Sequence, residues 1–308
     1  MRAKILFLAE KPVLREGLRL AQEMLSEMAV AFSHSFIMRE HLMDREFSPQ
    51  ELRDLSSDHD AVVLAGSQEF SDKAAKALSC FAGMSAFNRA DTVSELSRLK
   101  EGSIPSADFI WPLAGDTAII SKTAVTACAH AKKLRKNVVL SLNEGTQEWV
   151  DPLNKAAMYA ALPAPAILPL HEAMDTLLFQ QDRPSVVLAN SDEKNMLSSL
   201  MRFLTGTELL QHTNYYSDHI KLHSVIPPAG QQGFPLFSAL YAAASAVRES
   251  LLLEKEADCL DTAIANVLAS SWRTPEFGVW PKTISHEEAL RLIVEQVHLA
   301  GELMENFN

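Results

Sequence analysis

The sequence predicts an α/β protein in which a mostly parallel sheet is covered by helices. Short apolar runs at residues 4–9 and 60–66 have the length and composition of buried strands. Segments with a helical pattern separate these runs. One such helical segment opens with Ser48, Pro49 and Glu51, the order of a capping box. Strands that alternate with helices of these lengths are typical of a parallel sheet, because each crossover between parallel strands needs a helix.

The most informative local pattern is at residues 186–206, VVLANSDEKNMLSSLMRFLTG. It begins as a buried strand, and Ser191 is then expected to cap a helix. Asp192 and Glu193 fall in the first turn of that helix, where negative charge favours the helix dipole. The apolar residues that follow have the helical spacing of a face packed on a core: Leu197, Leu200, Met201 and Leu204. The sequence therefore predicts a strand, a capped turn and an amphipathic helix that ends at Gly206.

Composition and charge exclude several classes of protein. The chain has 308 residues, of which 47% are hydrophobic and 22% charged, as in an ordinary globular protein. Its net charge of -11 argues against nucleic-acid binding, which needs a basic surface. The one dense basic run, residues 132–136, is expected at the end of a helix, where cations favour the dipole.

Cysteine usage and hydropathy indicate a cytoplasmic protein. The three cysteines lie far apart, and none belongs to a CxxC pair, which favours a reducing compartment over a disulfide framework. No apolar run approaches the roughly 20 residues that span a bilayer. The first residues, MRAKILFLAEK, are expected to form a strand rather than a signal peptide, since Glu10 and Lys11 interrupt the apolar run.

Residues 186–206 also resemble the metal-site segment of the 3-isopropylmalate and isocitrate dehydrogenases, which are metal-dependent oxidative decarboxylases. The match has no gap, and both the Leu197-Ser198 pair and Gly206 fall where that family has theirs. The family holds Mg²⁺ or Mn²⁺ with two aspartates four residues apart on this helix. Here those positions are Asn195 and Ser199. The resemblance thus implies the helix without its metal ligands.

Only part of the family's substrate site has a counterpart. Residues 84–90, MSAFNRA, resemble the strand that carries a substrate-binding arginine, matched here by Arg89. Arg89 is therefore a candidate for binding a carboxylate, and the alternative is a surface ion pair with Asp91 or Glu95. The family's other arginines, on the preceding helix, have no match in residues 74–80.

The family's catalytic tyrosine and lysine are both missing. A glycine-rich segment with the tyrosine, followed by a protruding arm, is mostly deleted before the helix expected at residues 117–134. Residues 138–143, VVLSLN, resemble the strand that ends in the catalytic lysine. That lysine falls on Asn143, or on Glu144 if the match shifts by one residue, and neither can act as a cationic proton donor.

A remnant of a nucleotide loop occurs further along the chain. Residues 223–233, HSVIPPAGQQG, resemble the family's adenine-side loop, so His223, Gly230 and Gly233 are candidates for binding a cofactor. The family implies NAD(P), but the asparagine-proline signature after the loop is reduced to Phe234-Pro235. No GxGxxG or Walker motif is present. We therefore expect no bound cofactor.

The resemblance implies the isopropylmalate-dehydrogenase-like two-domain fold, with a mixed sheet in each domain and a central cleft. The first, nucleotide-side domain would comprise residues 1–93 and 221–308, and the second would comprise residues 94–220. Because residues 186–206 belong to the family's subunit interface, a homodimer through the second domain is implied. A heteromer with an active paralogue is the alternative.

Three functions stay open from the sequence. The first is a catalytically degenerate family member that binds or regulates, since ligands, acid and base are missing together. The second is an active NAD(P)-dependent oxidoreductase acting on a small hydroxy acid, with a site rebuilt from Arg89, Asp116, Glu144 and Asp192. The third is a zinc-dependent hydrolase that uses His219 and His223, four residues apart.

Overall fold

The structure is a computed structural model that describes residues 1–43, 47–87, 95–97, 107–179, 185–206, 208–228, 234–278 and 280–306. The chain forms two compact units. One comprises Met1–Ser79 with Leu209–Asn308, and the other comprises Cys80–Glu208. The domain boundaries predicted from the sequence, at residues 93/94 and 220/221, lie further along the chain. No helix in the described residues is long and apolar enough to span a bilayer.

The first unit contains five strands in the order β2-β1-β3-β10-β9. Four are mutually parallel, while β9 runs antiparallel to β10. Their bounds are β1 (Arg2–Ala9), β2 (Ser35–Leu42), β3 (Ala61–Ala65), β9 (Thr213–Tyr216) and β10 (Leu222–Val225). Every side chain of β3 is buried, as expected for a central strand of a parallel sheet covered on both faces.

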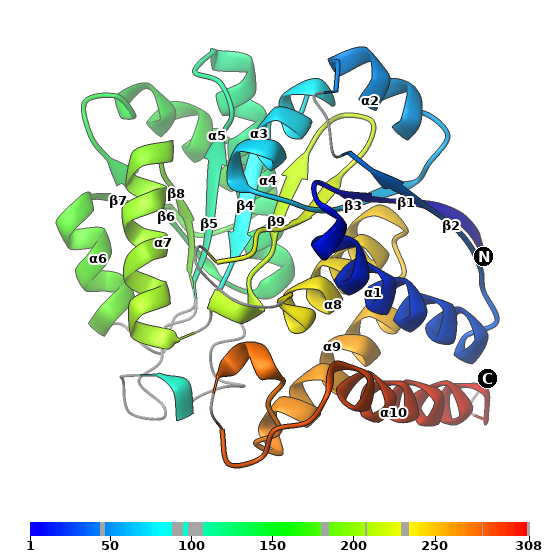
Figure 1. Ribbon diagram of the computed structural model, residues 1–308. Coiled ribbons are helices and arrows are strands. Elements are labelled where there is room, and N and C mark those ends of the chain that lie inside the picture. The colour runs from blue at the N-terminus through cyan, green and yellow to red at the C-terminus, as the bar shows by residue number, and fades with distance from the viewer. Residues whose placement is uncertain are drawn as a thin grey trace. The chain divides into compact units, whose positions relative to one another are not determined.

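Helices pack on this first sheet, and two of them, at the end of the chain, form an outer layer on the other helices (Figure 1). They are α1 (Pro12–Ala31), α2 (Pro49–Ser56), α3 (Gln68–Ala77), α8 (Leu236–Ser245), α9 (Glu254–Ala269) and α10 (His286–Asn306). A π-helical turn, η4 (Ala246–Ser250), extends α8, and a 3₁₀ turn, η5 (Pro275–Phe277), precedes α10. α10 packs along α1, which links the two ends of the chain. The predicted capping box of α2 is confirmed, since Ser48 Oγ accepts a hydrogen bond from the Glu51 N–H.

The second unit also contains five strands, in the order β4-β5-β8-β6-β7. β4 is antiparallel to β5, and the others are parallel. The strands are β4 (Ala82–Ala86), β5 (Ala107–Pro112), β6 (Asn137–Leu142), β7 (Ala166–Pro169) and β8 (Ser185–Leu188). The helices are α4 (Thr117–Leu134), α5 (Val150–Ala160), α6 (Leu170–Phe179) and α7 (Ser191–Thr205). Short 3₁₀ turns occur as η2 (Gln147–Trp149) and as η3 (Glu208–Leu210), where the chain passes between the units.

The predicted α/β class with mixed sheets is confirmed, and α7 follows β8 as the sequence indicated. Its cap differs by one residue. Asn190, rather than Ser191, is the N-cap, and its Oδ1 accepts the N–H of Glu193. α7 ends at Gly206 with φ of 66°, and a Cβ there would lie 2.6 Å from the Leu96 carbonyl oxygen. Glycine at this position therefore satisfies both the left-handed turn and the close approach.

A buried ion cluster joins β5 to the end of α4 in the second unit. Asp108 Oδ2 accepts a hydrogen bond from Lys136 Nζ at 2.7 Å and lies 2.9 Å from His130 Nε2. Asp108 Oδ1 accepts the N–H of Phe87. Burial alone would raise the pKa of Asp108, but the charges of Lys136 and His130 outweigh burial and hold that pKa well below its ordinary value. The basic run at residues 132–136 is thus only partly a helix-end feature, since Lys136 is buried.

We expect Lys136→Met to lower the free energy of unfolding by about 3–5 kcal/mol, because it leaves the Asp108 carboxylate buried without its ammonium partner. Urea denaturation followed by circular dichroism measures the loss. Lys132→Met is the matched control, since Lys132 is exposed in the last turn of α4 and should cost less than about 1 kcal/mol. Equal losses in the two variants would contradict the role given to the buried pair.

Candidate functional site

The carboxyl ends of β5, β8 and β6 define one edge of the second unit's sheet, where open α/β sheets generally bind ligands. The three strands are parallel, and residue Leu188 of β8 pairs with Ile110 on one side and Leu140 on the other. Trp111 of β5 and Ser141 of β6 therefore lie on either side of Ala189, the residue that follows β8. Their side chains point to the face that carries Phe109, Val139 and Val187, which pack with Leu197 and Met201 of α7.

A buried ammonium lies at this edge. Lys194, in the first turns of α7, is 7% exposed, and its Nζ sits 4.0 Å from the centroid of the Trp111 ring. The same Nζ donates a hydrogen bond to Asn195 Oδ1 at 3.0 Å. A cation desolvated over a tryptophan face is stabilised by about 2 kcal/mol. Lys194 was not identified from the sequence, and the lysine-to-tryptophan pairing between two distant segments carries no local pattern that could have revealed it.

The two positions assigned to metal ligands, Asn195 and Ser199, are exposed on the outer side of α7. Ser199 Oγ donates to the carbonyl oxygen of Asn195 at 2.8 Å, a bond within the helix. Hard divalent cations prefer carboxylate oxygens, whereas both side chains are neutral and the Asn195 oxygen already accepts an ammonium. These residues do not fit Mg²⁺ or Mn²⁺. Among the residues that the structure describes, no group of three or more His, Cys, Asp or Glu could hold a metal.

The start of α7 also contains buried polar atoms that the sequence pattern did not predict. Glu193 lies in the first turn of α7, as predicted, but it is only 6% exposed. Its Oε2, together with Ser141 Oγ and Ser198 Oγ, is buried and accepts or donates no hydrogen bond within the described chain. Each such atom costs about 1–3 kcal/mol, so the face of α7 against the sheet is less apolar than its leucine spacing indicated.

The end of β6 is a tight turn rather than a catalytic position. Asn143 Oδ1 accepts the N–H of Gly145 at 2.7 Å, and the Asn143 N–H is donated to Thr146 Oγ1 at 2.8 Å. Asparagine commonly forms such turns, so Asn143 has a sufficient structural role. Glu144, the alternative position of the family lysine, is exposed at the tip of this turn.

The acidic groups proposed for a rebuilt site have local structural roles or are solvated. Asp116 Oδ1 accepts the N–H of Ile119 and thereby caps α4. Asp192 is exposed in the first turn of α7. Arg89 lies outside the described residues. The described candidates, Asp116, Glu144 and Asp192, are thus not joined by any hydrogen bond between them that the structure records.

His223 lies in strand β10, not in a loop, and it is fully buried. Its Nδ1 is 2.8 Å from Asn214 Oδ1, and its Nε2 is 2.9 Å from Ser250 Oγ. Burial, and secondarily the charge of Lys221, lowers the pKa of His223 to about 3. Both ring nitrogens are therefore occupied by protein groups. Gly230 and Gly233, the other residues assigned to the nucleotide loop, lie outside the described residues.

The zinc site considered from the sequence, His219 with His223, is not formed, again because His223 is buried. His219 is exposed in a turn before β10, whereas His223 is enclosed within the sheet, so the two do not share the face of a helix. The order Ser250, His223, Asn214 does match the spacing of a nucleophile, its base and an orienting group. An inaccessible imidazole with a pKa of about 3 is, however, a poor general base at neutral pH. We interpret the three side chains as a structural link between β9, β10 and η4.

The helix that follows the predicted nucleotide loop has an internal anion at its start. Glu276 Oε1 accepts the N–H of Leu236, the first residue of α8, and Glu276 Oε2 lies 2.7 Å from His286 Nε2. A helix N-terminus can bind a phosphate, but here a buried carboxylate holds that position. Before this helix, Phe234 packs so closely on α1 that a Cβ at Gly17 would lie 1.8 Å from its ring.

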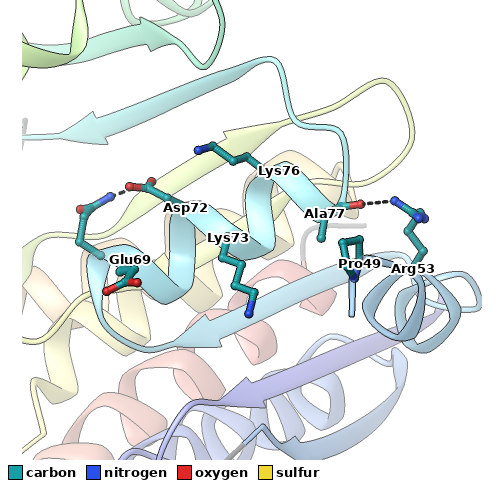
Figure 2. A pocket seen from close by; sticks show the side chains of 8 residues that line it. Pro49, Arg53, Glu69, Asp72, Lys73, Lys76 and Ala77 are labelled. Carbon is teal, nitrogen blue, oxygen red and sulfur yellow. Dashed lines mark hydrogen bonds between the residues drawn. The ribbon is translucent and has the colours of Figure 1, made fainter. Parts of the chain in front are cut away.

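A groove of about 950 Å³ lies between α2 and α3 in the first unit (Figure 2). Three cationic side chains line it, Arg53, Lys73 and Lys76. Arg53 Nη1 donates to the carbonyl oxygen of Ala77 at the end of α3, and Figure 2 shows Lys73 and Lys76 pointing to opposite sides of that helix. The cations do not converge on one point, so the groove lacks the arrangement of an anion site.

Comparison with known proteins gives one architecture. No protein-family model matches the chain, and no curated protein matches it in sequence. Solved structures with a similar fold include the isocitrate dehydrogenase from Methylococcus capsulatus, with a TM-score of 0.77 and 12% identity. The alignment covers 96% of this chain and 99% of that enzyme. The chain thus has an isocitrate-dehydrogenase-like fold over nearly its whole length.

We expect the buried His223 to make the protein less stable as pH falls. The folded pKa of about 3 lies below the ordinary value of 6.5, so the unfolded chain binds the proton more readily between these values. In His223→Gln this group no longer titrates. The stability difference between wild type and variant should shrink by about 1.4 kcal/mol per pH unit between pH 6 and pH 4.

Urea unfolding at several pH values measures this change. His219→Gln is the matched control, because His219 is exposed and its replacement should leave the pH dependence of wild type intact. A His223→Gln variant whose stability follows wild type in parallel over the whole range would show that His223 is not neutral and buried in solution.

Proposed function

We propose that this chain is a non-catalytic binding or regulatory protein built on the isocitrate- and isopropylmalate-dehydrogenase fold. The observation that carries the proposal is the contact between Lys194 Nζ and Asn195 Oδ1 at the start of α7. The resemblance assigns Asn195 to a metal ligand, and here its oxygen is bound to an internal cation. Oxidative decarboxylation of this family's kind needs a dication to polarise the substrate's oxygens.

The positions of the remaining catalytic groups support the same proposal. Asn143 forms a turn where the resemblance expects a cationic acid, and His223 is enclosed where it expects a nucleotide contact. Loss of metal ligand, acid and base together removes groups that act as a unit in catalysis, so a partial rate is not expected from the rest. The fold would then serve to present a surface or hold a ligand.

We expect no reduction of NAD or NADP by the purified protein with isocitrate or 3-isopropylmalate in the presence of Mn²⁺. Absorbance at the wavelength of the reduced nicotinamide measures the rate, and an isocitrate dehydrogenase assayed in parallel is the positive control. Turnover in the ordinary range for enzymes, about 1–10³ per second, would sink the proposal and favour an oxidoreductase with a rebuilt site.

A homodimer through α7 forms part of the proposal. Two large apolar side chains on the outer side of this helix, Met196 and Phe203, are each 58% exposed and lie two turns apart. The resemblance assigns this segment to the subunit interface, and a second copy of the chain would bury both side chains. A heteromer with an active paralogue would use the same surface.

We expect the wild-type protein to be a dimer by light scattering and Phe203→Glu to be a monomer, because a charge in an apolar interface is costly. Tyr159→Glu is the matched control, since Tyr159 is 84% exposed on α5, away from α7 in the chain. A wild-type monomer at tens of micromolar protein would contradict the homodimer and leave the heteromer as the arrangement to test.

A further inference from the structure

We propose that the ammonium of Lys194 is a built-in cation that takes the place of a divalent metal at the start of α7. The inference rests on the proposed function and deepens it, because it names the side chain that lies where the resemblance places a divalent metal. The disagreement between the residues and a metal site is thereby explained by a specific side chain rather than by simple loss.

The geometry fixes the ammonium firmly. Lys194 reaches inward from α7, its Nζ lies 4.0 Å from the Trp111 ring centroid, and the ring is itself 2% exposed. The hydrogen bond to Asn195 Oδ1, at 3.0 Å, places the charge beside the first of the two assigned ligand positions. A divalent ion bound by the side chain of residue 195 would lie a few ångströms from this fixed positive charge, which would repel it strongly in a partly desolvated site.

The ammonium of Lys194 supplies a positive charge but not the chemistry of a divalent metal. Asp192 and Glu193 both belong to the first turn of α7, and the Oε2 atom of Glu193 is buried. Lys194 follows these carboxylates in the chain and adds a permanent positive charge to the same end of α7. An ammonium cannot act as a Lewis acid on a hydroxy acid in the way that a dication does. The ammonium carries one positive charge rather than two, so Lys194 keeps a cation beside residue 195 without the chemistry of a dication.

The test places aspartates at positions 195 and 199, once with Lys194 present and once with Lys194 replaced. Binding of Mn²⁺ is followed by the loss of the free-ion signal in electron paramagnetic resonance. We expect no binding by wild type at millimolar Mn²⁺, and weak binding by the double variant Asn195→Asp, Ser199→Asp. Adding Lys194→Met to that double variant should tighten the binding at least tenfold, because the repelling charge is removed. Lys73→Met, a lysine over Phe47 in the other unit, is the matched control and should change nothing.

A second measurement does not depend on a metal. Asn195→Asp should raise the melting temperature in the wild-type background, because the new carboxylate would pair with Lys194. The same change in a Lys194→Met background should lower the melting temperature, since the carboxylate would then lack a cation. The assignment is overturned if Asn195→Asp has the same effect in both backgrounds, or if the double variant binds Mn²⁺ as tightly with the lysine as without it.

Failure of this inference is distinct from failure of the proposed function. Mn²⁺ binding to wild type that is abolished by Asn195→Ala would overturn the lysine assignment, while a protein without turnover would still fit a non-catalytic role. Metal-independent reduction of NAD(P) would overturn the non-catalytic role. The lysine assignment would then be judged from the melting temperatures of Asn195→Asp with and without Lys194.

Discussion

Several elements of the second unit depend on one buried polar group, the Asp108 carboxylate. Its two oxygens bind the Lys136 ammonium, the His130 ring and the Phe87 N–H, so one fully buried charge joins β5, α4, the start of β6 and the end of β4. Lys136 lies at the amino end of β6, opposite the edge at which α7 begins. The cluster thus fixes the sheet from one end and leaves the carboxyl ends of the strands to vary.

This separation explains how the fold can persist while the site changes. The apolar core beneath α7 contains Phe109, Val187 and Leu197, all of which are fully buried. Asn195 and Ser199, which the resemblance places at metal-ligand positions, lie on the outer side of α7, and both side chains are exposed. The requirements for folding and for metal binding are therefore borne by different faces of one helix.

Sequence patterns predicted the α/β class, the capping box of α2 and the end of α7 at Gly206, since these depend on residues close together in the chain. They failed where a side chain's role depends on distant partners. Lys136 was assigned to a helix end and His223 to a loop, yet a buried aspartate and a buried asparagine decide their roles. Glu193 was interpreted only as a first-turn acid that favours the helix dipole, but the protein encloses its side chain.

At three places in the structure, polar groups are satisfied by other groups of the chain. Asn143, where the resemblance places the family's lysine, closes a turn, and Glu276 accepts the N–H of Leu236 at the start of α8. Lys194 adds a third case, a cation supplied internally beside Asn195. Although three polar atoms near the start of α7 have no hydrogen bond within the described chain, the groups at these three places have partners from within it. That pattern is expected of a protein whose stability has become independent of the ligands that the fold accommodates in enzymes.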